Sequence, residues 1–257
     1  MMQKKRARLL AVVTAVALGV LLIATQFDQQ VHYVNPGTLN HHFFWRRGWY
    51  YDGTDWVYVR GSRKVTGSQK INGVQYHFQA DGRQILPYRV SRQYELTSSQ
   101  GSNQRATPKY IILHDVGSRA TGQQAASFMQ RTANSNQAYT NFIVGNGGTV
   151  YLMKEPGTVS WGAGTTVNQN APVQIELGQT SNAATFRRDY QAYVALARDM
   201  AGKYNIPLTL DQGGAGVKGI KSHRWVSQHI WGDHQDPYEY LARFGVTKQE
   251  LVDDLAG

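Results

Sequence analysis

The sequence predicts an α/β domain with a mixed central β-sheet flanked by helices, preceded by a small β-hairpin module and an N-terminal transmembrane helix. Three observations support this prediction. They are an apolar N-terminal run, an aromatic segment with turn-forming dipeptides, and a C-terminal part that mixes strand-like runs with segments of helical periodicity. A length of 257 residues accommodates one full domain and a smaller module.

Residues 1–28 have the pattern of a membrane anchor. An almost uniformly apolar run, residues 9–25, follows four basic residues, Lys4, Lys5, Arg6 and Arg8. As a helix this run would span roughly 25 Å, slightly less than a hydrocarbon core of about 30 Å. The basic flank is expected to stay in the cytoplasm, which places residue 29 onward outside. A cleaved signal peptide has the same charge order, but small residues at the cleavage positions are hard to find here. We therefore favour an uncleaved signal anchor at the cell surface over a secreted protein.

The net charge of +10 is concentrated in the N-terminal half. Residues 29–109 hold eleven Lys or Arg and four Asp or Glu, whereas residues 110–257 hold twelve of each. A basic segment outside the membrane suits an anionic wall polymer such as teichoic acid, or the anionic membrane surface. Charge that serves only solubility is the alternative. Nucleic acid, the usual partner of so basic a protein, is disfavoured by the export signal.

Residues 29–95 are interpreted as a basic, aromatic β-hairpin module. Aromatic residues flank an Asp-Gly turn in residues 49–59, and residues 72–83 repeat this rhythm with Asn-Gly and Asp-Gly. These dipeptides favour tight hairpin turns, and alternating aromatics suit strands with one packed face. The two segments resemble the cell-wall-binding repeats, of choline- or glucan-binding type, of Gram-positive surface proteins. The alternative is a hairpin spacer whose rings pack on one another. Residues 96–108 have the composition of a linker.

Residues 109–257 supply the α/β pattern. Apolar runs predict strands at 110–113, 141–144, 149–153 and 173–177, and Gly145-Asn146-Gly147-Gly148 predicts a hairpin between the second and the third. Helical spacing of apolar residues predicts helices at 123–133 and 183–204, the second of which ends before Pro207. Thr247 and Glu250 are spaced as in a capping box that opens a final helix.

Three polar residues of this domain form a candidate zinc site. His114 ends the apolar run of the first strand, and His223 and Asp236 follow more than a hundred residues later, so only folding can bring them together. The chain has no cysteine, so a zinc ion would have to be held by imidazole and carboxylate. A catalytic zinc usually keeps three protein ligands and one open position. Each residue also has an ordinary interpretation: a core or surface histidine, a loop histidine and a turn cap. His229 and Asp233 are competing ligand candidates.

Two further residues suit acid–base chemistry beside such a site. Glu176 lies near the end of the strand 173–177, an apolar setting in which a carboxylate is costly unless it is paired or functional. It could accept a proton from an attacking water, or simply pair with Arg224 or Lys221. His234, two residues from Asp236, could donate to the oxyanion or to the leaving amine.

From about residue 108 to 257 the chain resembles the zinc-dependent N-acetylmuramoyl-L-alanine amidases of the type-2 family, which share a fold with peptidoglycan-recognition proteins. The similarity is greatest to the autolysin and phage-lysin branch. It extends over the whole domain through residues 111–114, 141–147, 175–177, 219–223 and 233–241.

This resemblance implies that His114, His223 and Asp236 bind zinc, that Glu176 is the catalytic acid/base, and that His234 stabilises the transition state. Many relatives have Lys at the His234 position, whereas the autolysin branch has His. The chain departs from the family where Val116 replaces the usual Ser or Thr, which removes a hydroxyl close to the first ligand.

The resemblance also implies a substrate, peptidoglycan, cut at the amide bond between N-acetylmuramic acid and L-alanine of the stem peptide. Trp161, Trp225 and Trp231 offer flat faces for sugars, and we single out Trp161 and Trp231 as substrate-binding residues. Tyr139 and Asn141 are candidates for contact with the stem peptide. Two other functions compete: a non-catalytic peptidoglycan-binding or scaffolding protein, and a secreted bacteriolytic lysin. Non-catalytic relatives typically lack a zinc ligand, and all three positions are filled here, which favours the enzyme.

Overall fold

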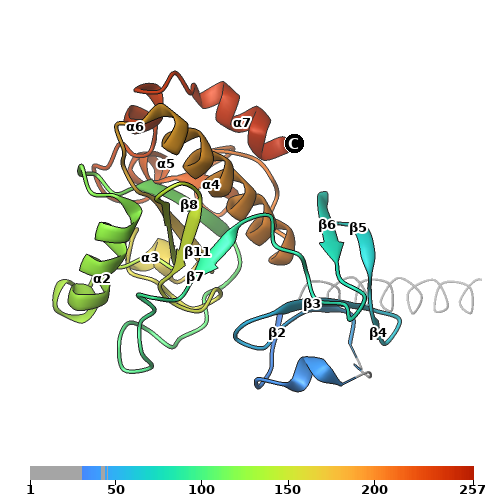
Figure 1. Cartoon of the computed structure of the whole chain (residues 1–257). Coiled ribbons are helices and arrows are strands. Elements are labelled where there is room, and N and C mark those ends of the chain that lie inside the picture. Colours follow the sequence, from blue (N-terminus) through green and yellow to red (C-terminus); the bar gives the residue numbers. More distant parts are fainter. Residues whose placement is uncertain (1–30, 42–43, 45) are drawn as a thin grey trace, which may run out of the picture. The chain divides into compact units, whose positions relative to one another are not determined.

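The computed structural model describes residues 31–41, 44 and 46–257 (Figure 1). The predicted anchor, residues 1–28, lies outside the described residues. Among those that are described, no helix combines the length and the apolar character needed to cross a bilayer. Contacts divide the chain into two compact units. The N-terminal unit comprises the described residues up to Gln69 together with Gln75–Ile85, and the C-terminal unit comprises Lys70–Val74 and Leu86–Gly257.

The N-terminal unit is built from short strands. Its four-stranded sheet has the order β1-β2-β3-β4, with strands Val31–Tyr33, Gly48–Tyr51, Trp56–Arg60 and Arg63–Lys64, and a 3-10 helix, η1, covers Thr38–Asn40. A two-stranded sheet is formed by β5 (Gly67–Ile71) and β6 (Val74–Phe78), of which Lys70–Val74 belong to the C-terminal unit and the remainder to the N-terminal unit. The expected hairpin joins β2 and β3, since Asp52 Oδ1 accepts from the amides of Thr54 and Asp55, and Gly53 takes a positive φ of 91°.

The aromatic residues of this unit form its interior. Trp49 contacts the rings of Trp56, Tyr58, Tyr76 and Phe78 at centroid distances of 4.7–6.2 Å. All five side chains are buried. Rings that fill a core have no face left for a ligand. The burial therefore favours the second interpretation given above, a hairpin module whose rings pack on one another.

The C-terminal unit contains a six-stranded mixed sheet with the order β12-β8-β11-β9-β10-β7. Its strands are β7 (Arg89–Ser91), β8 (Tyr110–Asp115), β9 (Phe142–Gly145), β10 (Thr149–Leu152), β11 (Val173–Leu177) and β12 (Gly219–Ser222). β9 and β10 are antiparallel, and the other neighbours are parallel. The predicted mixed α/β architecture is confirmed.

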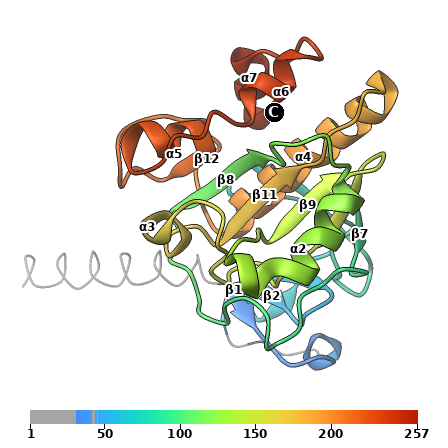
Figure 2. The ribbon, with the colours of Figure 1, turned by 90° about the vertical axis from the view of Figure 1, so that its left-hand side faces the viewer.

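Helices cover both faces of this sheet. The six helices of the unit are α2 (Gly122–Asn136), α3 (Thr165–Asn168), α4 (Ala183–Lys203), α5 (His223–His229), α6 (Tyr238–Ala242) and α7 (Lys248–Ala256). Figure 2 shows α2 in front of the sheet beside β9, with α4 behind the sheet; α2 contacts β9 and β10, and α4 contacts β8, β9, β10 and β11. A capping box opens α2, because Thr121 accepts from the Gln124 amide while the Gln124 side chain accepts from the Thr121 amide. At α7, Thr247 accepts from the amide of Glu250.

The boundary between the two units differs from the predicted one. The aromatic module was expected to end at residue 95 and a linker to occupy 96–108, yet the C-terminal unit already includes Leu86 onward. The reason is hydrogen bonding: β7 pairs with β10, and the amide of the buried Leu96 donates to Met153 at 2.7 Å. The serine- and glycine-rich composition of this segment therefore reflects surface turns fastened to the domain.

Candidate active site

Three neighbouring parallel strands bring the predicted residues together at their carboxyl ends. His114 on β8 and Glu176 on β11 are register partners, so their side chains point to the same face of the sheet. On the other side of β8, Ser222 of β12 pairs with Leu113, and His223 follows as the first residue of α5. Ligand sites of α/β sheets form at the carboxyl ends of strands, and Figure 2 shows β12, β8 and β11 side by side.

Asp236 is brought to these residues by the loop that follows α5. Its carbonyl accepts from the amide of Arg224 at 3.0 Å, and its Oδ2 accepts from the amide of Asp115 at 3.3 Å. A second carboxylate, Asp211, holds the flanking segments: it accepts from the amide and hydroxyl of Ser222 and from the hydroxyl of Tyr238. Both ends of the loop are thereby fixed to the sheet.

The donor atoms of His114, His223 and Asp236 fit a single divalent ion. The two Nδ1 atoms are 3.0 Å apart, His114 Nδ1 is 3.4 Å from Asp236 Oδ2, and His223 Nδ1 is 3.3 Å from Asp236 Oδ1. A tetrahedral site with bonds of about 2.0–2.1 Å has donor–donor edges of roughly 3.3–3.4 Å. Among the described residues, this is the group of His and acidic side chains able to hold a metal ion. The competing candidates lie elsewhere: His229 stacks on Trp225, and Asp233 is exposed.

Mutual burial determines the charges in the cluster. Burial, with the neighbouring charge of His114, lowers the pKa of His223 to about 4, so this ring is neutral at pH 7. Burial lowers the pKa of His114, but the hydrogen bond to Asp236 and the charge of Glu176 outweigh it and leave that pKa raised. Burial also raises the pKa of Asp236, yet its hydrogen bonds to both histidines prevail and hold it well below the usual range. Asp236 is therefore an anionic candidate ligand.

Glu176 is buried and incompletely hydrogen-bonded. Its side chain Oε2 has no hydrogen-bond partner within the part of the chain that the structure describes. Burial raises the pKa of Glu176 to about 7, against the opposing charge of His114. The alternative, an ion pair with Lys221, does not form, because that ammonium donates to the carbonyl of Gln212 and lies over the ring of Trp225. A buried carboxylate with an unpaired oxygen is a candidate general base.

His234 lies at the solvent side of the cluster. Its ring stacks on His223 with a centroid separation of 3.8 Å, and its Nδ1 is 3.4 Å from Asp236 Oδ1. The His234 side chain is 53% exposed, whereas the candidate ligands are buried or nearly so. This places an imidazole where an incoming substrate would meet the cluster.

Trp161 and Trp231 line one cavity of about 570 Å³. Trp231 is 65% exposed and lies against Gly164, where a Cβ would come within 2.8 Å of the indole. Trp161 packs edge-on against Tyr139 at 5.0 Å. The other aromatic and polar candidates, Trp225, Tyr139 and Asn141, are buried, so they pack the domain and are not available to substrate. Val116 packs against the hydrophobic core between α2 and the sheet, which includes Ala126 and Ile143.

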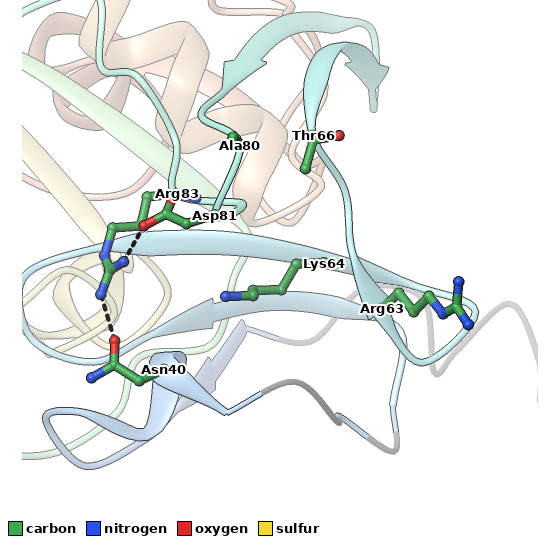
Figure 3. A pocket seen from close by; sticks show the side chains of 7 residues that line it. All are labelled: Asn40, Arg63, Lys64, Thr66, Ala80, Asp81 and Arg83. Atoms are coloured by element: carbon green, nitrogen blue, oxygen red, sulfur yellow. Dashed lines mark hydrogen bonds and ion pairs between the residues drawn. The ribbon is translucent and has the colours of Figure 1, made fainter.

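The N-terminal unit has a cavity of its own, of about 500 Å³ (Figure 3). Arg83 on its wall is held by Asp55 at 2.8 Å, by Asn40 at 2.8 Å and by Asp81. Lys64 donates to the carbonyl of Leu39, and Arg63 points away from this cluster. The cavity therefore combines cations with carboxylates that partly neutralise them.

Gln174 is a residue of the site that the sequence interpretation missed. It lies on β11 two residues before Glu176, is fully buried, and its Oε1 is 3.0 Å from His114 Nε2. The available signal was a polar residue between Val173 and Ile175 in a run that is otherwise apolar.

A mixed α/β sheet with imidazole and carboxylate donors around a common point, and a buried glutamate beside them, is typical of metal-dependent hydrolases. Residues 104–239, just over half of the chain, match the family described as N-acetylmuramoyl-L-alanine amidase, and the chain belongs to this family. The resemblance seen in the sequence is thereby confirmed at the level of the family.

Individual relatives agree with this assignment. The chain is 43% identical over 150 residues to an endolysin of Listeria phage A511, a match covering 57% of this chain and 43% of the relative. It is 29% identical over 155 residues to a lytic amidase of Streptococcus pneumoniae phage HB-3, covering 57% of this chain and 46% of the relative. The chain thus spans less than half the length of these curated relatives.

Solved structures show the same fold. The crystal structure of the Staphylococcus aureus hydrolase AmiA with its ligand superposes with a TM-score of 0.59 at 22% identity, over 67% of this chain and 83% of AmiA. PlyL superposes with a TM-score of 0.51 at 16% identity, over 66% of this chain and 97% of PlyL.

Proposed function

We propose that this protein is a zinc-dependent peptidoglycan hydrolase that cleaves the amide bond between N-acetylmuramic acid and L-alanine of the stem peptide. Family membership supports the reaction class. The observation that carries the proposal is the convergence of His114, His223 and Asp236 on one point, with Glu176 beside His114 across two strands. His114, His223 and Asp236 are the proposed ligands.

The chain's own residues have separate roles in the proposed reaction. A zinc ion held by the three ligands would act as a Lewis acid and lower the pKa of water. Glu176 accepts the proton of the attacking water and returns it to the leaving amine, a role suited by a pKa near neutrality. His234, on the exposed side, donates to the oxyanion that develops on the scissile carbonyl.

Substrate is proposed to reach the site over the cavity that Trp161 and Trp231 line. An exposed indole offers a flat apolar face to a sugar ring, and the polar lining residues, among them Gln104 and Gln169, offer partners for hydroxyl groups. The cavity is linked to the cluster by hydrogen bonds: Asn168, which lines it, bonds to Gln174, and Gln174 bonds to His114.

We further propose that the protein works outside the cytoplasm, held at the membrane by residues 1–28 and on the wall by its basic segment, residues 29–109. The charge of that segment, eleven basic against four acidic residues, supports an anionic wall polymer as its partner.

A digestion of purified cell wall by the purified protein tests the reaction. New α-amino groups on L-alanine without new reducing ends are expected, and they should disappear on chelation and return with added zinc. Reducing ends alone would identify a glycosidase instead. Absence of product from protein that has bound zinc would favour the competing function, a non-catalytic wall-binding protein.

A further inference from the structure

Two buried amide side chains connect His114, the first candidate ligand, to the loop that contains Trp161, Gly162 and Ala163, here called the Trp161 loop. Asn168, at the end of α3, hydrogen-bonds to Gln174 on β11, and Gln174 hydrogen-bonds to His114 on β8. Gln174 is fully buried, and Asn168 and His114 are at least nine-tenths buried. Gln174 and His114 therefore have no bulk water as an alternative partner.

The backbone fixes which atom of each amide faces which neighbour. Asn168 Oδ1 accepts from the amides of Gly162 and Ala163, at 3.2 and 2.8 Å, and only an oxygen can do so. The Gln174 atom 2.9 Å from Asn168 Oδ1 must then be the Nε2 donor, which also donates to the carbonyl of Ser160 at 3.3 Å. It follows that Gln174 presents Oε1, an acceptor, to His114.

The acceptor on Gln174 determines which ring nitrogen of His114 carries the proton. Gln174 Oε1 lies 3.0 Å from His114 Nε2, and an acceptor at that distance requires an N–H on the ring nitrogen. The single proton of the neutral ring has two possible acceptors, Gln174 Oε1 at 3.0 Å from Nε2 and Asp236 Oδ2 at 3.4 Å from Nδ1, and the shorter contact favours the proton on Nε2. The other nitrogen, Nδ1, then carries a lone pair. Nδ1 is the atom that faces His223 and Asp236.

We propose that Gln174 and Asn168 are positioning residues that hold His114 in the Nε2–H tautomer and thereby direct its Nδ1 lone pair at the metal position. The proposal rests on the proposed function, since it presumes that the cluster holds zinc. Ligating histidines usually donate their other N–H to a fixed acceptor, and loss of that partner typically weakens metal binding about 10- to 100-fold. Here the acceptor is a neutral amide whose own orientation is set by backbone N–H groups.

The Trp161 loop is packed directly on this amide. A Cβ at Gly162 would lie 2.5 Å from Gln174 Oε1, and Gly162 has no positive φ that would independently require glycine. A methyl group there displaces the acceptor without removing any hydrogen-bonding group. Gly162→Ala is therefore a second, independent way to disturb the tautomer.

The decisive measurement needs no variant and no zinc. In the metal-free protein, 15N NMR of the histidine rings, at a pH where His114 is neutral, reports which nitrogen carries the proton. The expected result is the Nε2–H tautomer for His114, and a predominantly Nδ1–H ring would overturn the proposal. A residue with a merely structural role would leave this signature unchanged when substituted.

Variants then test the two amides. Gln174→Met keeps the length of the side chain but offers no acceptor, so we expect a mixture of His114 tautomers and zinc affinity lowered about 10- to 100-fold in chelator competition. Asn168→Leu should act in the same direction. Asn168→Asp is the matched control, since its Oδ1 can still accept from Gly162, Ala163 and Gln174, and it should retain affinity close to wild type.

The outcomes separate this proposal from the proposed function. Unchanged zinc affinity and tautomer in folded Gln174→Met would overturn the positioning role. If Gln174→Met does not fold, the test of the positioning role rests on the His114 tautomer of the wild-type protein and on the comparison of Asn168→Leu with Asn168→Asp. A wild-type protein that binds no zinc contradicts the proposed function even with His114 as Nε2–H. Zinc binding without wall hydrolysis rejects the reaction while the positioning role stands.

Discussion

Glu176 is a residue that is costly to the fold and that suits the proposed reaction. It lies on β11, the strand between β8 and β9, its carboxyl group is buried, one of its oxygens lacks a partner among the described residues, and burial raises its pKa from an ordinary 4.5 to about 7. A group whose ionised form is disfavoured by the folded state destabilises that state whenever the pH forces it to ionise. Two predictions follow from this one shift.

The first prediction concerns stability. Between pH 4.5 and about 7 the folded metal-free protein holds a proton on Glu176 that the unfolded chain has lost, so stability falls as pH rises through this window. Glu176→Gln has no ionisable group at this position, so its stability does not decrease in this way. Its advantage in free energy of unfolding should be small near pH 4.5 and reach up to roughly 3 kcal/mol above pH 7, at 1.36 kcal/mol per unit of pKa shift. Urea denaturation of both metal-free proteins at several pH values checks this, and a difference independent of pH would contradict it.

The second prediction concerns the reaction. In the proposed reaction the ionised form of Glu176 is the base. The value of kcat/KM should therefore decrease as the pH falls below about 7, and a bound cation should shift this acidic limb of the pH profile to lower pH. Glu176→Gln should lower the rate at least ~10²-fold and remove the limb, while zinc content stays at the wild-type level. A variant with wild-type turnover would exclude Glu176 from the mechanism.

The sequence could indicate these side chains but not the residues that position them. Residue chemistry and family resemblance both predicted the five side chains that lie together in the cluster, which are His114, His223, Asp236, Glu176 and His234. Of the amides behind them, Gln174 stands out in the sequence only as a polar residue in an apolar run. Its partners and those of Asn168 could not be predicted, because the partner of a buried Gln or Asn is determined by three-dimensional contacts. Trp161 and Trp231 line the same cavity, and their role in binding substrate stays a prediction.

At the scale of elements, segments with a run or a period of apolar residues were predictable, and segments without one were not. The helix expected at 183–204 is α4, and the strand at 173–177 is β11. β7 and β12 were missed because each has only one apolar side chain, Val90 or Ile220, among polar residues and glycine, whereas β9 and β10, which are no longer than β12, are apolar runs. β12 begins at the end of a glycine-rich stretch, residues 213–219, so the sequence alone predicts a loop there. It is a strand because it pairs with β8.

A glycine contact that fixes α2 to the sheet gives the third prediction. A Cβ at Gly178, just after β11, would overlap the backbone of Gly122 at the start of α2, and a Cβ at Gly145 would lie 2.7 Å from Gly122 Cα. Backbone cannot yield as a flexible side chain does, so Gly178→Ala should lower the free energy of unfolding by at least ~2 kcal/mol. The matched control is Gly214→Ala, which meets nothing within 4 Å. Equal stability of the two variants in chemical denaturation would show that α2 can shift freely.

At the scale of the whole molecule, charge and chemistry are divided along the chain. The candidate active site lies in residues 110–257, where basic and acidic residues balance, while residues 29–109 carry the excess of seven positive charges. The aromatic rings that suggested a binding module are buried in the N-terminal unit, so any affinity of that unit for the wall should come from its charged surface. Such affinity depends on ionic strength, because exposed charges are screened over about 10 Å at 0.1 M salt.

The fourth prediction tests this division with two pairs of charge reversals. Arg60 and Arg63 are exposed on the N-terminal unit, and Arg187 and Lys218 are exposed on the C-terminal unit, so reversing either pair to Glu changes the net charge equally. A basic residue near an anionic surface contributes about 1 kcal/mol, so the Arg60→Glu/Arg63→Glu variant should lose at least about tenfold in affinity for purified wall at low salt. The Arg187→Glu/Lys218→Glu variant should bind nearly as wild type. The difference should vanish at high salt and on walls stripped of their anionic polymers. If both variants lose affinity equally, the attraction depends on net charge alone, and the N-terminal unit is not the part that recognises the wall.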